Sequence, residues 1–161
     1  MKNNLVIRSA VTPEDVKHIR EIVTSTNFFH DYEIDVAVEL VEEALVEGKE
    51  SGYSFLFVEV DSKTVAYSCF GLIPCTKSSY DLYWIVVHHD FRSNGIGKKL
   101  LELTEQAARE MGGSGMYAET SSQQLYEPTR RFYLANNYIE EAKLKDFYNP
   151  GDDKLVYSKR L

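Results

Sequence analysis

The segment from Asp81 to Gly112 constrains the fold most, because a strand, a glycine-bearing turn and a helix follow one another without interruption. Its first part, residues 82–87, is a short run of apolar, β-branched and aromatic residues, which is typical of a strand buried on both faces. From Ile96 onward, apolar residues recur every three or four positions, which predicts an amphipathic helix. Gly112 and Gly113 are expected to end this helix.

The turn between strand and helix, Arg92–Gly97, reads R-S-N-G-I-G. Its two glycines carry no Cβ, so the backbone can turn sharply and approach a ligand closely. The first N–H groups of the following helix have no partner within the helix, and both they and the helix dipole favour an anion. The turn lacks the G-K-[ST] of a Walker sequence and the G-x-G-x-x-G order of a dinucleotide fingerprint. The sequence therefore predicts a phosphate site of another kind.

The spacing of this site resembles the signature of the GCN5-related N-acetyltransferases, the GNAT family. The matching residues are Arg-x-x-Gly-x-Gly between a strand and a helix, preceded by Val87-x-His89-x-x-Arg92. The resemblance covers nearly the whole chain. It implies that the turn holds the pyrophosphate of acetyl-CoA, and that the acetyl group passes to a primary amine by direct attack in a ternary complex. No metal and no covalent enzyme intermediate are needed.

A second segment carries the same resemblance. Residues 132–138, F-Y-L-A-N-N-Y, are similar to the family's late l-Y-x-x-x-G-F segment, with Asn137 in place of Gly and Tyr138 in place of Phe. Asn is the residue other than Gly that most readily adopts a left-handed conformation, so the first replacement is compatible with a turn. The match implies that Tyr133 is the general acid that protonates the departing thiolate; core packing is the alternative.

The rest of the chain completes a mixed α/β (α+β) pattern of about seven strands and four helices in a single domain, residues 1–161. The predicted strands are residues 5–8, 53–60, 65–73, 82–87, 116–120, 138–147 and 155–159. The predicted helices begin near residues 12, 35, 96 and 127, the first with a Thr12 cap and the second with Val36 among its inward residues. This element order is also that of the GNAT family.

The cofactor contacts implied by the resemblance are mainly backbone groups. The pantetheine arm is expected along the strand and the pyrophosphate on the turn: Ile85, Val86, Val87 and His88, then Arg92, Ser93, Asn94, Gly95, Ile96, Gly97 and Lys98. The arm would lie beside the strand like an additional strand. One N–H of that strand would polarise the acetyl carbonyl.

The general base stays open between three carboxylates. Family members often use an acid on the strand before the turn, and Asp81 stands at the head of that strand. Glu119, on the next predicted strand, is the main alternative, and Glu33 is the third. Any of them would act by removing a proton from the attacking amine, since only the neutral amine is a nucleophile.

The acceptor is expected near two segments that combine aromatic and acidic residues. One contains Phe28, Phe29, Tyr32 and Glu33, and the other is the turn region 147–153. Such surfaces suit a cationic amine with an apolar body. Two other classes of function remain as alternatives. One is a non-catalytic acyl-CoA-binding module, and the other is a partner-binding domain that keeps only the fold.

Composition narrows the remaining possibilities. A net charge of −7 argues against binding to nucleic acid or to an anionic membrane, and no apolar run approaches membrane-spanning length. The N-terminal residues 1–8 contain no secretory apolar region and the chain has only two cysteines, so a cytoplasmic location is expected. The expected state is a monomer or a homodimer. Cys69 and Cys75 are predicted to be small buried residues. His88 and His89 are adjacent on a strand and face opposite sides, so no metal site is expected.

Overall fold

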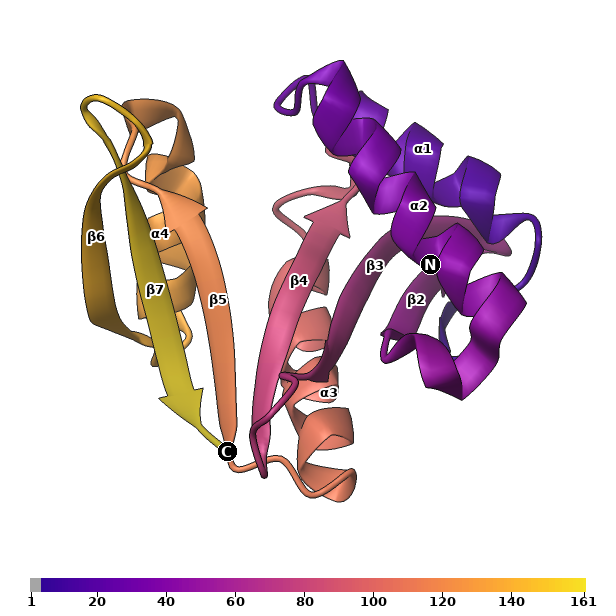
Figure 1. Cartoon of the computed structure of the whole chain (residues 1–161). Coiled ribbons are helices and arrows are strands. Elements are labelled where there is room, and N and C mark those ends of the chain that lie inside the picture. The colour runs from indigo at the N-terminus through magenta and orange to yellow at the C-terminus, as the bar shows by residue number, and fades with distance from the viewer. Residues whose placement is uncertain (1–3) are drawn as a thin grey trace. The chain divides into compact units, whose positions relative to one another are not determined.

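The computed structural model describes residues 4–161, so the first three residues of the predicted N-terminal segment lie outside the described part. Seven strands form a mixed sheet in the order β1-β2-β3-β4-β5-β7-β6, and four helices accompany it, which confirms the predicted α/β class (Figure 1). The strands are β1 Leu5–Arg8, β2 Ser54–Val60, β3 Lys63–Leu72, β4 Ser79–Val87, β5 Gly115–Ser121, β6 Ile139–Asn149 and β7 Asp152–Arg160. The helices are α1 Asp15–Ser25, α2 Asp31–Glu47, α3 Ile96–Glu110 and α4 Glu127–Ala135.

The chain divides into two compact units. Unit 1 comprises the residues up to Gly71 together with Trp84–Thr104, and unit 2 comprises Leu72–Tyr83 together with Glu105–Leu161. The boundaries cut through β4 and α3, so each of these elements contributes to both units. The prediction of a single domain over residues 1–161 stays a prediction.

Unit 1 is built on the antiparallel strands β1, β2 and β3. Helices α1 and α2 lie over one face of β2 and β3 (Figure 1). Helix α3 contacts β3 through a buried hydrogen bond of 2.7 Å between the hydroxyls of Ser68 and Thr104. Side chains from β2 and β3 stack in the core, with the Phe57 and Tyr67 rings 6.3 Å apart. Burial of these large aromatic groups supplies much of the hydrophobic stabilisation of this unit.

The start of α1 is secured by a buried carboxylate and not by the predicted Thr12 cap. The helix begins at Asp15, whose side chain is fully buried. Its carboxylate accepts hydrogen bonds of 2.8 Å from both terminal nitrogens of Arg8 and from the backbone N–H of Thr12. Burial by itself would raise the pKa of Asp15, but these hydrogen bonds outweigh it and lower the pKa below its usual value. The Thr12 hydroxyl donates to the carboxylate and does not cap the helix, so that prediction was wrong.

Helix α2 begins four residues earlier than predicted, at Asp31. A capping box explains the difference. The side chain of His30 accepts a hydrogen bond from the backbone N–H of Glu33, the third residue of the helix, and the Glu33 carboxylate accepts one of 2.8 Å from the backbone N–H of His30. The buried face is formed by Ile34, Ala37, Val38, Val41 and Ala44. Val36, predicted to face inward, is 45% exposed, because it lies outside this face, whereas Val41 and Ala44 are buried as predicted.

In unit 2, β5 pairs antiparallel with β7, which pairs antiparallel with the edge strand β6. The first part of β4 joins this group by parallel pairing of Ser79–Asp81 with Gly115–Tyr117. Helix α4 packs on β7 through Tyr133 and Tyr157, whose rings are stacked 5.7 Å apart. Helix α3 ends at Glu110, and Gly112 has a φ of 94°, as expected of a glycine that ends a helix.

Two further expectations can be compared with the structure. Cys69 is buried as predicted, but Cys75 is exposed, in the turn after β3 where its φ is 66°. That part of the prediction was wrong, because the turn protrudes from the packed strands. None of the helices described for residues 4–161 is both long and apolar enough to cross a membrane.

Candidate functional site

The predicted phosphate turn leads directly into α3. Ser93 and Gly95 both have left-handed backbones, with φ of 62° and 76°. A Cβ built on Gly95 would meet no other atom within 4 Å, so glycine is required here by conformation and not by crowding. Arg92 and Lys98 are exposed on either side of the turn. An exposed turn, an open glycine, two flanking cations and a helix N-terminus together fit a phosphate-bearing ligand.

The strand residues before the turn are less free than predicted. The backbone N–H of His88 donates to the carbonyl of Val65 at 2.8 Å, so this N–H is already engaged. The His88 ring nitrogen Nδ1 accepts the N–H of Asp90 at 3.2 Å. The N–H of His89 donates to the Ser25 hydroxyl at 3.0 Å, which attaches the end of α1 to this turn. His88 therefore has a clear structural role, and a backbone contact to pantetheine would use the other residues.

Tyr133 belongs to unit 2 and is almost completely buried. Its ring stacks on Tyr157 and lies 5.3 Å from the ring of Tyr138. Burial raises the pKa of the Tyr133 hydroxyl, so the group keeps its proton at neutral pH. The side chain is thus both part of the core of its unit and protonated, as a general acid must be before it acts.

The two main carboxylate candidates for the base lie in the same unit and influence each other. Burial, and then the negative charge of Glu119, raise the pKa of Asp81, while the positive charge of Lys154 lowers it. Lys154 and Glu119 form an ion pair of 2.8 Å. The pKa of Asp81 is thus moved toward the range useful for a base, whereas the Glu119 carboxylate is engaged by Lys154.

The hairpin between β6 and β7 contributes residues that the sequence pattern did not single out. The Lys154 ammonium lies 4.5 Å from the centre of the Phe147 ring, a cation–π contact. The Ser121 hydroxyl donates to the buried carboxylate of Asp152. On the paired strands, Lys154 of β7 lies opposite Ser121, which is two positions from Glu119 on β5. Lys154 could therefore have been predicted as a partner of Glu119 only from the register of these strands.

The predicted acceptor segment lies in unit 1, and its residues have different surroundings. The rings of Phe28 and Phe29 are 5.0 Å apart, and Phe29 lies 5.1 Å from Trp84 on β4. Trp84 was not predicted as a site residue, although it is the only tryptophan of the chain. Tyr32 is 67% exposed. The carboxylate of Glu33 is engaged in the capping box of α2, which is a structural use.

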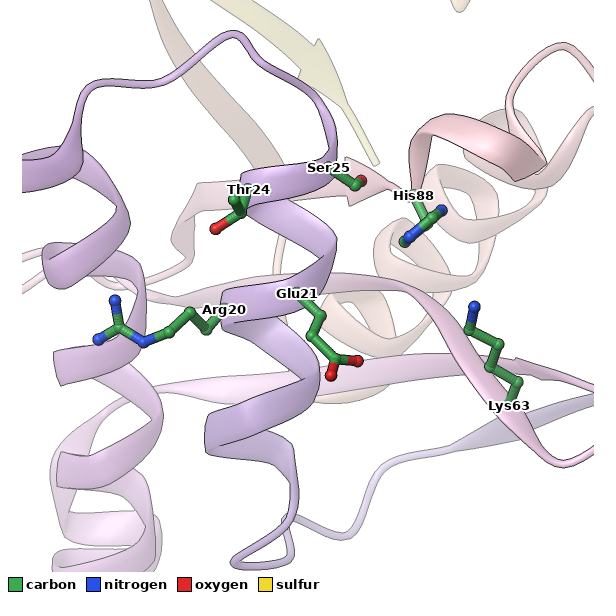
Figure 2. A pocket seen from close by; sticks show the side chains of 6 residues that line it. All are labelled: Arg20, Glu21, Thr24, Ser25, Lys63 and His88. Atoms are coloured by element: carbon green, nitrogen blue, oxygen red, sulfur yellow. The ribbon is translucent and has the colours of Figure 1, made fainter.

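A separate open pocket of about 600 Å³ lies beside α1. It is lined by Arg20, Glu21, Thr24, Ser25, Lys63 and His88. In Figure 2 Arg20 extends toward the side of α1 that faces away from Lys63 and His88. Arg20 also pairs with Asp35 at 3.3 Å, and the Lys63 ammonium lies 5.7 Å from the Phe91 ring. These positive groups do not converge on one point, so the pocket is not an evident anion site.

The predicted site residues therefore fall into two sets. The turn, the preceding strand residues and the acceptor segment belong to unit 1, while Tyr133, Asp81 and Glu119 belong to unit 2. Within residues 4–161, no three or more His, Cys, Asp and Glu side chains are grouped so that they could hold a metal ion.

Comparisons with known proteins agree with this geometry. Residues 16–137 match the model of the Acetyltransferase (GNAT) family. A crystal structure from Desulfovibrio desulfuricans, described as an acetyltransferase of the GNAT family, is 42% identical, with a TM-score of 0.96 over 98% of this chain and 99% of that one. No curated protein matches the chain in sequence.

Two more distant structures share the fold. The ribosomal-protein-S18-alanine N-acetyltransferase of Escherichia coli is 15% identical, with a TM-score of 0.75 over 98% of this chain and 94% of that one. The PaiA N-acetyltransferase of Thermoplasma acidophilum, solved in complex with coenzyme A, is 17% identical, with a TM-score of 0.74 over 98% and 99%.

Proposed function

The chain belongs to the acetyltransferase (GNAT) family, and we propose that it transfers the acetyl group of acetyl-CoA to a primary amine within a ternary complex. The observation that carries the proposal is the turn before α3, in which Ser93 and Gly95 adopt left-handed conformations at the start of a fifteen-residue helix. In this proposal the N–H groups of residues 93–98 hold the pyrophosphate, and Arg92 and Lys98 add positive charge. The bound acetyl-CoA supplies the activated thioester.

The pantetheine arm is assigned to the backbone of residues 85–88. Because the N–H of His88 is engaged with Val65, the N–H that polarises the acetyl carbonyl comes from Ile85, Val86 or Val87. Backbone recognition of this kind depends on the path of the chain and not on side-chain identity. Substitutions that keep the strand should therefore leave acetyl-CoA affinity largely unchanged.

Asp81 is proposed as the general base. Its raised pKa makes it a better proton acceptor than an exposed carboxylate, and Glu119 is occupied by Lys154. The amine loses a proton, its nitrogen forms the bond to the acetyl carbon, and the carbon–sulfur bond breaks. Asp81 receives the proton that the amine loses, and the thiolate takes the hydroxyl proton of Tyr133. Solvent water then returns a proton to the Tyr133 phenolate, and Asp81 releases its proton to solvent. Glu119 remains the alternative base, and Glu33 is disfavoured by its capping role.

A cationic amine with an apolar body is the proposed acceptor class. Exposed Tyr32 and the aromatic pair Phe28 and Phe29 support an apolar contact, and the acidic residues of the chain support a positive charge. The proposed location is the cytoplasm, as a monomer or homodimer, on the basis of the sequence alone.

The experiment that tests the function measures CoA release with a panel of primary amines, including polyamines, amino acids, aminoglycosides and peptide N-termini. Mass spectrometry of the amine must show one added acetyl group for each CoA released. Binding of acetyl-CoA without transfer to any amine would favour the non-catalytic module, and failure to bind CoA would favour a partner-binding domain.

A further inference from the structure

In unit 2, an ion pair between Glu105 and Lys159 is connected to Tyr133 through Tyr138. Glu105, on α3, is only 5% exposed. Its carboxylate accepts a hydrogen bond of 3.1 Å from the hydroxyl of Tyr138 and pairs with the Lys159 ammonium at 2.8 Å. A buried carboxylate is stable only when its oxygens are paired, and here one oxygen binds each partner. The pairing therefore fixes the position of the Tyr138 ring through the far end of its side chain.

Tyr138 in turn contacts Tyr133 in two ways. Its backbone N–H donates to the carbonyl of Tyr133 at 3.0 Å, and the two rings lie 5.3 Å apart with their planes at 53°. Between them, Asn137 has a φ of 68°, which reverses the chain directly after α4 and returns Tyr138 to the helix. The left-handed conformation expected for Asn137 is thereby confirmed.

The opposite side of the Tyr133 ring is held by β7. Tyr157 stacks on it with the planes at 24°, and Tyr157 and Lys159 are two positions apart on the strand, so they face the same side. The contacts thus form a closed circuit: Tyr133 to Tyr138, to Glu105, to Lys159, and along β7 back through Tyr157. Loss of one polar contact in the circuit would allow the Tyr133 ring to shift.

We propose that Tyr138, held by Glu105 and Lys159, is a positioning residue that orients the Tyr133 hydroxyl for proton donation to the thiolate. The proposal rests on the acid role proposed above for Tyr133. Proton transfer requires the donor to lie within hydrogen-bond reach of the acceptor, and an offset of about 1 Å is enough to slow a reaction strongly. Tyr138 itself is not a competing acid, because its hydroxyl already donates a hydrogen bond to the Glu105 carboxylate.

A double-mutant cycle tests the proposal through turnover at saturating acetyl-CoA, with a slow acceptor so that chemistry limits the rate. In the wild-type background, Tyr138→Phe should lower kcat about 10-fold, roughly the effect of losing one hydrogen bond of 1.4 kcal/mol. The KM for acetyl-CoA should not change. In the Tyr133→Phe background, the same substitution should change kcat less than about twofold, because the acid that it positions is absent.

Tyr80→Phe is the matched control. Tyr80 is 4% exposed and Tyr138 is 2% exposed, both lie in unit 2, and the Tyr80 hydroxyl donates to the carbonyl of Met111 at 3.3 Å. The control removes the same group from an equally buried place outside the circuit, so kcat should stay at the wild-type value. Thermal unfolding should show that both variants are folded at the assay temperature.

Two further comparisons complete the test. Glu105→Gln keeps an oxygen that accepts from Tyr138 and should retain more turnover than Glu105→Ala; equal loss in both would contradict the proposal. If Tyr138→Phe lowers kcat equally in the wild-type and Tyr133→Phe backgrounds, Tyr138 acts on the fold. That result would overturn the positioning role of Tyr138 and leave the acid role of Tyr133 in place. If Tyr133→Phe keeps full turnover, the acid role fails, and the positioning role fails with it.

Discussion

A charge placed at Gly95 should separate the phosphate site from the stability of the turn. Gly95 has a φ of 76° and open space around its Cβ position, so any L-residue there meets strain of about 1–2 kcal/mol but no clash. Gly95→Glu and Gly95→Gln share this strain and nearly the same volume. They differ in one negative charge, which is therefore the only variable between them.

The expected size of the charge effect follows from Coulomb's law. A carboxylate about 5 Å from one phosphate charge, at an effective dielectric constant of about 20, is disfavoured by about 3 kcal/mol. Gly95→Glu should therefore bind acetyl-CoA about 100-fold more weakly than Gly95→Gln. Because the site is exposed, the difference in acetyl-CoA affinity between the two variants should become smaller as salt is raised from roughly 0.05 M to 0.5 M, which brackets physiological ionic strength.

Isothermal titration calorimetry of both variants with acetyl-CoA, together with their unfolding curves, provides the assay. The two proteins should unfold at similar temperatures and differ in affinity. Equal affinity of the Glu and Gln variants, at low salt and with both proteins folded, would refute the placement of the pyrophosphate on this turn.

Three further predictions concern charged side chains. Asp15→Asn should lower the free energy of unfolding by on the order of 2 kcal/mol at pH 7, since the Arg8 guanidinium loses its two charge-assisted hydrogen bonds to Asp15 and keeps the ion pair with Glu59. Denaturant unfolding should show this loss shrinking as the pH falls through the lowered pKa of Asp15, where the wild type loses the same contribution. Asp81→Asn should raise the unfolding temperature at pH 7, because a carboxylate with a raised pKa makes the folded wild-type protein less stable as the pH rises. It should also slow turnover, because the proposed base is lost. Unchanged turnover, with Glu119→Gln inactive, would transfer the base role to Glu119. Lys154→Met should shift the acidic limb of the rate profile to higher pH, because the Lys154 charge lowers the pKa of Asp81; a shift to lower pH would contradict the assignment of that limb to Asp81.

The sequence predicted the elements whose signals are local and strong. The strand, turn and helix around Arg92–Gly97 have glycines and a regular apolar period in one short stretch, and the structure confirms them. The start of α2 was missed because its cap is a His30 side chain paired with Glu33, and His is an unusual cap. For the same reason, the sequence did not predict that the Glu33 carboxylate takes part in the cap of α2.

Contacts between distant segments could not be predicted from spacing. The Lys154–Glu119 pair depends on the register of β5 against β7, and a shift of one residue would place these side chains on opposite faces. The circuit through Glu105 joins α3, β7 and the residue after α4, which no local pattern connects. Such contacts determine the pKa and orientation of the candidate catalytic groups, so the sequence could propose candidate residues but could not predict their surroundings.

A crystal structure with bound CoA tests the central claim most directly. The account predicts the pyrophosphate on the N–H groups of residues 93–98 and the CoA sulfur within about 3.5 Å of the Tyr133 hydroxyl, a reach typical of hydrogen bonds to sulfur. CoA bound away from this turn, or a Tyr133 hydroxyl directed away from the sulfur, would contradict it.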